Sequence, residues 1–254
     1  MDKYIIFCDI DGTVVDVGGK SMSPSVIAEL NRLKSHGHIP IVVTGRPYFQ
    51  LESLGGVENF SYMASLFGSV IIDSNGKTKI IGHSLDIDGV KRLVKLATDN
   101  HRVWHYKNSY RSKCIINDKT TIEKHKALLV DKEEFQQDLI NGNVFQLFIN
   151  GTIFDNAEEM FPQFGFYQMP GNYFDVTDKR VSKKIAIEYF KSLFPDYKTI
   201  SIGDSDNDID MFNNTDISIS MGNAKPEIQA LTTYVTLPVN QDGFTYAFNE
   251  ILKL

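Results

Sequence analysis

Cysteine is scarce in this chain, and long apolar runs and basic stripes are missing from it. Only Cys8 and Cys114 occur among 254 residues, so neither a disulfide framework nor a cysteine-rich zinc site is indicated. No apolar stretch approaches the roughly 20 residues of a membrane helix, and no charged and apolar leader precedes the first apolar segment. The 26 Lys and Arg residues are outnumbered by 32 Asp and Glu residues and form no nucleic-acid-binding stripe. We therefore expect a cytoplasmic globular protein without nucleic-acid or membrane partners.

Two carboxylates stand where the first apolar run ends. Residues 4–8 are followed by Asp9, Ile10, Asp11, Gly12 and Thr13. The run suits a strand buried on both faces, and open α/β sheets hold their ligands at the carboxyl ends of such strands. Enclosed carboxylates two residues apart need a cation or a shared proton, and a hard oxygen site favours Mg²⁺. The alternative for an Asp-x-Asp-Gly tetrapeptide is an ordinary turn.

A second apolar segment, residues 39–43, ends in Thr44-Gly45-Arg46-Pro47. This sequence puts a hydroxyl and flexible backbone amides between a strand and a helix, where N–H groups can hold a phosphate. The alternative for Thr44 is a plain helix N-cap.

A third apolar segment, residues 199–202, ends in Gly203-Asp204-Ser205-Asp206-Asn207-Asp208. The helix before it opens near Ser182 and carries Lys183 and Lys184 at its start. Either amine could face the acidic groups. Asp206 is expected on the surface.

The regions around these segments predict further elements of the same domain. Residues 14–20 suggest a short β-excursion, and Ser23 with Pro24 predicts the N-terminus of a helix that ends near Gly37. Two β-rich runs, 70–73 and 78–81, flank Ser-Asn-Gly-Lys and predict a hairpin. Strands at 217–220 and 234–236 and a closing helix at 244–252 are expected near the end of the chain.

The pattern between residues 83 and 180 predicts a separate α+β unit with short strands and no acid pair at a strand end. We expect a core domain of residues 1–82 and 181–254 with a domain of residues 83–180 inserted into it. Within the insertion we expect helices at 88–99, 132–140 and 152–162 and strands at 102–106, 110–116, 144–149, 164–169 and 172–177.

The order of the polar groups resembles the four motifs of the haloacid dehalogenase-like (HAD) phosphatases. These are Asp9-Ile-Asp-Gly-Thr13, Thr44-Gly-Arg46, Lys183 and Gly203-Asp204-Ser-Asp-Asn207-Asp208. The insertion is similar to the C2-type cap of the Cof subfamily, which includes sugar-phosphate phosphatases, and Asn223-Ala224 and Asp242-Gly243 also fit that subfamily. One departure is Lys184, where the subfamily usually has Gly. The resemblance implies an α/β, Rossmann-like core with a parallel sheet and an inserted α+β cap that selects the substrate.

The resemblance also implies a function, a Mg²⁺-dependent phosphatase that hydrolyses small phosphorylated metabolites, with sugar phosphates favoured, through an aspartyl-phosphate. The implied catalytic residues are Asp9 as nucleophile, Asp11 as general acid and base, and Lys183. The implied substrate-binding residues are Thr44, Gly45, Arg46, Lys183 and Asn207. The implied metal site comprises Asp9, the backbone carbonyl of Asp11, Asp204 and Asp208. Asp208 would act indirectly, by orienting Lys183 or a metal-bound water.

Other functions remain open. A phosphotransferase or phosphomutase could use the same groups if a sugar hydroxyl intercepted the acyl phosphate. A phosphoryl-receiver module also has an acidic pocket with Thr and Lys, but the inserted domain and the acid at position 11 argue against it. A non-catalytic phosphometabolite sensor would be expected to lack Asp9 or Asp11. Neither the physiological substrate nor the oligomeric state is indicated by the sequence.

Overall fold

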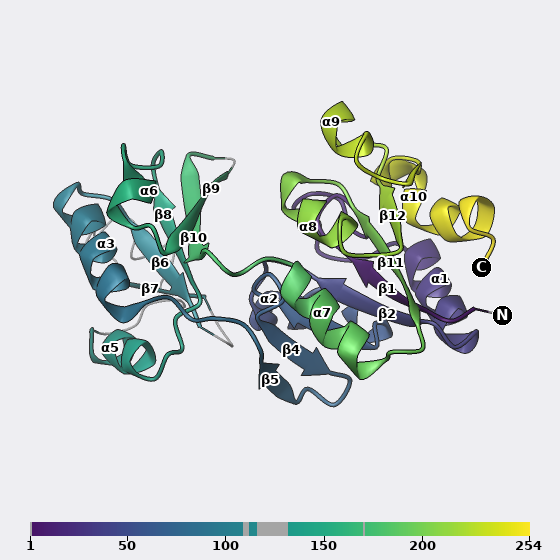
Figure 1. Cartoon of the computed structure of the whole chain (residues 1–254), viewed down its shortest axis with the longest axis horizontal. Helices are drawn as coiled ribbons and strands as arrows, with labels where there is room; N and C mark the ends of the chain where they lie inside the picture. Colours follow the sequence, from purple (N-terminus) through teal and green to yellow (C-terminus); the bar gives the residue numbers. More distant parts are fainter. Residues whose placement is uncertain (1, 109–111, 116–131, 170) are drawn as a thin grey trace. The chain divides into compact units, whose positions relative to one another are not determined.

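The computed structural model describes all residues except 1, 109–111, 116–131 and 170 (Figure 1). The chain forms two compact units. The core unit comprises Met1–Arg46, Gln50–Ile81 and Ser182–Leu254, and the inserted unit comprises Pro47–Phe49 and Gly82–Val181. Each unit has its own sheet and its own hydrophobic core.

The core unit is built on an eight-stranded sheet in the order β13-β12-β11-β1-β2-β3-β4-β5. The six strands from β13 to β3 are parallel, and β4 and β5 add an antiparallel hairpin at one edge. This arrangement confirms the predicted α/β fold with a parallel sheet. The strands are β1 (Tyr4–Cys8), β2 (Ile39–Val43), β3 (Tyr62–Ser65), β4 (Val70–Asp73), β5 (Thr78–Ile80), β11 (Lys198–Gly203), β12 (Ile217–Ser220) and β13 (Tyr234–Val235).

Helices cover this sheet, and β1 and its neighbours β2 and β11 are buried at every position after the first. Side chains of β1, β2, β3 and β4 pack with α7, α8 and α9 in one cluster, which includes Phe7, Val43 and Phe190. Helix α1 packs against β2 and α10. The helices are α1 (Pro24–Ser35), α2 (Tyr48–Glu52), α7 (Lys184–Leu193), α8 (Ile209–Phe212), α9 (Pro226–Gln229) and α10 (Gly243–Tyr246), with 3₁₀ turns at Val57–Asn59, Asp206–Asp208 and Val239–Gln241 and a π-helix at Ala247–Ile251.

The inserted unit has a five-stranded antiparallel sheet in the order β7-β6-β8-β10-β9. One face of this sheet, with Trp104, Leu147 and Phe174 among its side chains, joins α3 and α5 in a hydrophobic core. The elements are α3 (Ile87–Asp99), β6 (Trp104–Lys107), β7 (Ser112–Ile115), α5 (Lys132–Ile140), β8 (Gln146–Asn150), α6 (Ala157–Met160), β9 (Phe164–Met169) and β10 (Tyr173–Asp178).

Three expectations need correction. Residues 14–20 form no strand but a tight turn, because the carbonyl of Ile10 accepts the backbone N–H groups of residues 13, 14 and 15, and only an isolated bridge joins Asp11 to Val15. The helix expected at 152–162 is reduced to α6, since Asn156 is left-handed (φ 55°). The closing helix passes from α10 into the π-helix. Strand β3 and helix α2 were not anticipated, and residues 110, 111 and 116 of one expected strand lie outside the described residues.

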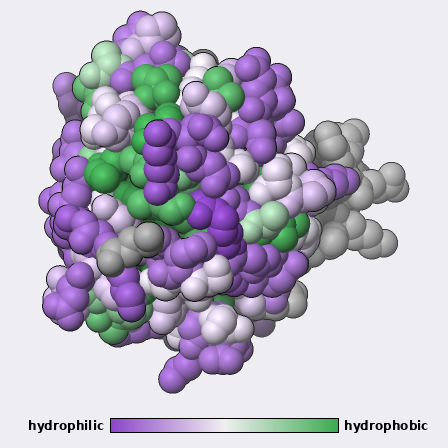
Figure 2. Space-filling model, turned by 90° about the vertical axis from the view of Figure 1, so that its right-hand side faces the viewer, coloured by the Kyte–Doolittle hydropathy of each residue, from purple (hydrophilic) through white to green (hydrophobic). Residues whose placement is uncertain are grey.

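The surface of the protein is chemically mixed. Figure 2 shows one face on which hydrophilic residues predominate and hydrophobic residues gather in smaller areas. Within the described ranges, no helix is both long enough and apolar enough to cross a membrane.

Candidate active site

Three neighbouring parallel strands bring the predicted motifs to the same edge of the core sheet. Asp9 follows β1, Thr44 follows β2 and Asp204 follows β11, and these strands are adjacent in the order β11-β1-β2. The backbone N–H of Asp9 donates to Ile202 at 3.0 Å, which continues the β1–β11 pairing to the first aspartate. The sheet itself therefore fixes where the carboxylates begin.

Lys183 is the central cation of this edge. It is completely buried directly before α7, and its Nζ donates to Asp9 Oδ1 at 2.5 Å and to Asp208 Oδ1 at 2.6 Å. Burial alone would lower the pKa of Lys183, but the carboxylates of Asp208 and Asp9 outweigh burial and hold that pKa above its ordinary value. Lys184 instead lies half exposed beside Glu188 at 3.4 Å. Of the two amines, Lys183 is the one that the structure brings to Asp9.

Asp208 uses both of its carboxylate oxygens within the protein. Oδ1 accepts from Lys183, and Oδ2 accepts the backbone N–H groups of Asp204 and Ser205, each at 3.0 Å. A side chain on Gly203 would collide with the Asp208 carboxylate, so glycine is required there. Asp208 therefore shapes the loop that carries Asp204 and places Lys183.

The acidic groups of Asp9, Asp204 and Asp208 have the chemistry of a cation site. Carboxylate oxygens of Asp9, Asp204 and Asp208 lie within 4.8 Å of one another, and Asp204 Oδ1 is buried without a hydrogen-bond partner. Burial is the main cause that raises the pKa of Asp9 and of Asp204 to about 7, and repulsion from Asp208 adds to it in both cases. A hard divalent cation such as Mg²⁺ suits such oxygen donors. The residues present fit the predicted metal.

Asp11 is engaged by Arg46. The guanidinium donates through Nε to Asp11 Oδ2 at 2.9 Å and through Nη2 to Oδ1 at 2.5 Å, a two-point ion pair. The Asp11 carboxylate is 38 % exposed, in contrast to the enclosed Asp9. The hydrogen bonding of Arg46 to the Asp11 carboxylate is the main cause that raises the pKa of Arg46. The structure thus pairs a predicted substrate-binding residue with the predicted acid.

The remaining predicted substrate-binding residues differ in how enclosed they are. Thr44 is buried and its Oγ1 accepts from the backbone N–H of Arg46 at 3.2 Å, whereas α2 begins only at Tyr48, so Thr44 does not cap that helix. A side chain on Gly45 would meet the ring of Phe67. Asn207 is exposed and its Oδ1 accepts from Ser205 Oγ at 3.2 Å, within its own loop.

Comparison with known proteins decides the family. A family model described as haloacid dehalogenase-like hydrolase matches residues 6–248. The chain belongs to this family. The predicted resemblance, and with it the prediction of an enzyme, is confirmed.

Several relatives align with the hydrolase over nearly their whole lengths. The Bacillus subtilis protein YkrA is 29 % identical, with 99 % of this chain and 98 % of YkrA covered. The 5-amino-6-(5-phospho-D-ribitylamino)uracil phosphatase YitU of Bacillus subtilis is 23 % identical, with the same coverage of 99 % and 98 %. Among solved structures, the HAD subclass IIB sugar phosphatase BT4131 superposes with a TM-score of 0.78 at 22 % identity and covers 100 % of both chains. This structural likeness shows that the hydrolase has the HAD fold.

Sequence reasoning gave no role to Asn223, which the structure places at the acidic edge. Its Nδ2 donates to the Gly12 carbonyl at 2.9 Å and to Asp204 Oδ2 at 3.2 Å, and its Oδ1 accepts from the Val239 N–H at 2.9 Å. The only sequence signal was the Asn223-Ala224 pair, which fits the Cof subfamily but does not indicate which residues Asn223 contacts.

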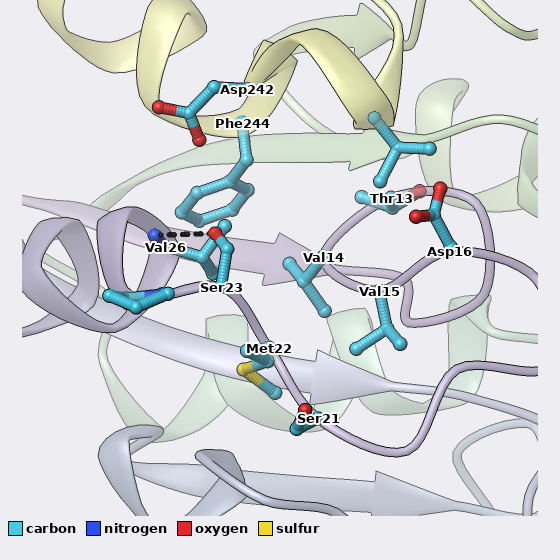
Figure 3. Close-up of a pocket in the computed structure, with 12 residues that line it drawn as sticks. Thr13, Val14, Val15, Asp16, Ser21, Met22, Ser23, Val26, Asp242 and Phe244 are labelled. Carbon is cyan, nitrogen blue, oxygen red and sulfur yellow. Dashed lines mark hydrogen bonds between the residues drawn. The ribbon is translucent and has the colours of Figure 1, made fainter.

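A pocket of about 300 Å³ lies next to the turn that follows Asp11 (Figure 3). Its wall includes Thr13 to Asp16 from that turn, the start of α1 near Ser23, and Asp242 and Phe244 from the C-terminal segment. The described residues that line it include two carboxylates and no Lys or Arg. Among the described residues, this lining therefore offers a phosphate dianion no cationic side chain.

Proposed function

We propose that this hydrolase is a Mg²⁺-dependent phosphatase that hydrolyses small phosphorylated metabolites through an aspartyl-phosphate. One observation carries the proposal: the buried Asp9 carboxylate is hydrogen-bonded through Oδ1 to Lys183, in an acidic cluster suited to a cation. The hydrogen bond from Lys183 goes to Oδ1, and we assign the attack on phosphorus to the other oxygen of the carboxylate, Oδ2. A nucleophilic carboxylate held by a cationic side chain is what covalent phosphoryl transfer requires.

In the first step, Asp9 Oδ2 forms a bond to phosphorus while the bond from phosphorus to the leaving alcohol breaks. Bound Mg²⁺ would be held by Asp9 and Asp204 and would supply positive charge against the phosphoryl oxygens. Lys183 adds a second positive charge beside the nucleophile. The Thr44 hydroxyl and the Gly45 amide, at the end of β2, would bind phosphoryl oxygens, with Asn207 as a further donor.

Asp11 carries the proton in both steps. It gives a proton to the leaving alcohol, then takes one from the water that attacks the aspartyl-phosphate, which releases inorganic phosphate and restores Asp9. Both of its oxygens accept hydrogen bonds from Arg46, and in this proposal the ion pair opens when the substrate binds. Arg46 then has a free guanidinium for the phosphate, which reconciles its predicted role with its observed partner.

For the substrate we propose sugar phosphates or closely related phosphorylated polyols. The fold neighbour BT4131 is a sugar phosphatase, and the relative YitU is a phosphatase whose name specifies a phosphoribityl compound. The inserted unit, residues 82–181, is proposed as the cap that recognises the organic part of the substrate. Transfer to a sugar acceptor instead of water is the alternative outcome of the same chemistry.

The test compares Asp9→Asn with Asp206→Asn. Asp206 is a matched control because its side chain is exposed and forms an ion pair with Lys225 at the surface. We expect Asp9→Asn to lower phosphate release at least about a thousandfold, since the amide cannot attack phosphorus, and Asp206→Asn to have little effect. Release is measured with p-nitrophenyl phosphate and a panel of sugar phosphates, without and with added sugar. Asp9→Asn activity within tenfold of wild type would refute the nucleophile, and release that needs an added acceptor would favour transfer.

A further inference from the structure

Asn223 joins three segments of the core unit that are far apart in sequence. It follows β12, and its side chain bonds to the turn after β1 at Gly12, to the loop after β11 at Asp204 and to the C-terminal segment at Val239. The amide thereby uses its nitrogen as a double donor and its oxygen as an acceptor. No other amide-bearing residue of the predicted motifs makes three such contacts among the described residues.

These contacts restrict the Asp204 carboxylate to one orientation. Asn223 occupies Oδ2, and Gly12 is packed so closely against the same oxygen that a side chain at position 12 would collide with it. The backbone of Asp204 is fixed independently by Asp208, which accepts its N–H. Oδ1 is left buried and without a partner. One oxygen of Asp204 is therefore held by the protein, and the other is presented to the acidic cluster.

We propose that Asn223 is a positioning residue that presents Asp204 Oδ1 as a single-oxygen ligand, and that it thereby sets the preference of the site for Mg²⁺ over Ca²⁺. The inference rests on the proposed function, because the proposed cation is Mg²⁺. Magnesium demands near-ideal octahedral geometry at short distances, whereas calcium accepts more ligands, including two-oxygen carboxylates, in flexible geometry. A carboxylate that can no longer turn favours the smaller ion.

Because Asn223 is exposed, its effect on the position of Asp204 can be tested without disturbing the fold. The side chain lies at the surface, so replacing it leaves no cavity and water can take over the released hydrogen bonds. Water does not fix the angle of the Asp204 carboxylate, and the link to Val239 is lost at the same time. Asn223→Ala should therefore keep the fold while the carboxylate gains freedom.

The experiment measures Mg²⁺ and Ca²⁺ binding by titration calorimetry for wild type, Asn223→Ala and Asn214→Ala. Asn214 is the control because it is a half-buried asparagine whose side chain donates to the backbone carbonyl of Asp210 and not to Asp204. We expect the Mg²⁺ dissociation constant of Asn223→Ala to rise about 10- to 100-fold, the usual effect of removing a partner of a metal ligand. The Ca²⁺ constant should change less, and melting temperatures should stay the same.

Two results would overturn the inference. Equal weakening of both ions would show a general loss of the site, and unchanged Mg²⁺ binding in Asn223→Ala would show that Asn223 does not position the ligand. A third result, wild-type protein that binds no Mg²⁺, would overturn the proposed function together with this inference. The wild-type titration therefore separates the two failures. Phosphate release by Asn223→Ala at saturating Mg²⁺ gives a second check, since positioning predicts recovery of turnover there.

Discussion

The two units differ in how their buried polar side chains are arranged and hydrogen-bonded. In the core unit, Lys183 is neutralised by two carboxylates, and Thr199 exchanges hydrogen bonds with Asp216. In the inserted unit, the paired strands β8 and β10 place Gln146 opposite Thr177, and neither side chain has a hydrogen-bond partner although both are buried. An unsatisfied buried polar group costs about 1–3 kcal/mol. The core unit also has buried side-chain oxygens without a partner, on Thr13, Ser69 and Asp204. Those of the inserted unit differ in lying together on two adjacent strands, β8 and β10.

Asp175 belongs to the same face of the inserted sheet. It is two residues before Thr177, its Oδ1 accepts no hydrogen bond, and its nearest cation is Lys107 at 3.9 Å. Burial raises the pKa of Asp175, against the opposing charge of Lys107 and a polar contact with Gln146 that does not reach hydrogen-bond geometry. Unsatisfied side chains grouped on two adjacent strands give this face hydrogen-bonding capacity, which supports recognition as the role proposed for this unit.

Removal of the central cation should break the pairing of the core unit most severely. Lys183→Met leaves Asp9 and Asp208 buried without a cation, a change that typically costs about 3–5 kcal/mol. We expect phosphate release to be lost and the free energy of unfolding at neutral pH to fall by about that amount. Lys184→Met is the control because that amine is half exposed and contacts only Glu188. Equal effects of the two substitutions, measured by urea unfolding and phosphate release, would contradict the assignment of Lys183.

The centre of the core unit could be predicted because strand ends and short motifs carry it. Asp9, Thr44 and Asp204 follow apolar runs that became the adjacent strands β1, β2 and β11, so pattern alone placed them at one edge. What the pattern could not supply is side-chain pairing. Arg46 was expected to bind the substrate but forms an ion pair with Asp11, and no contact was expected for Asn223. Both pairings depend on long-range packing, which short motifs do not reveal.

The inserted unit was predicted as a set of elements rather than as a site. Helix α3 and strands β9 and β10 lie close to their expected ranges, since their periodicity is regular. The helix expected at 152–162 failed because Asn156 adopts a left-handed conformation that its sequence context does not reveal. The face that carries Gln146 and Thr177 could not be predicted from a motif. The burial of these two side chains depends on which strands become neighbours.

Asp204 is the carboxylate of the acidic cluster for which the described residues show no ion pair, and it offers a test by pH. The pKa of Asp204 is raised from 3.8 to about 7 in the folded protein, chiefly by burial. A carboxyl group whose pKa is raised by folding destabilises the folded state once the pH exceeds its unfolded pKa. The resulting loss of unfolding free energy grows from about pH 4 and levels off above about pH 7. Metal-free Asp204→Asn should therefore melt higher than wild type at pH 8, by about 2–4 °C for each kcal/mol relieved, and the gain should shrink toward pH 4. A gain that is independent of pH would contradict the raised pKa.

The smallest expected effect gives the sharpest comparison of the two units. Thr177 and Thr199 are both buried threonines on strands, but only Thr199 has a partner, since its Oγ1 donates to Asp216 at 2.7 Å. Thr177→Val should stabilise the inserted unit by about 1 kcal/mol, because it removes an unsatisfied hydroxyl, and Thr199→Val should destabilise the core unit by a similar amount. The single tryptophan, Trp104, lies in the core of the inserted unit, so its fluorescence during urea unfolding reports that unit, while circular dichroism reports the whole chain. If both substitutions destabilise equally, the Thr177 hydroxyl is satisfied by ordered water, and the proposed difference between the units does not hold at this position.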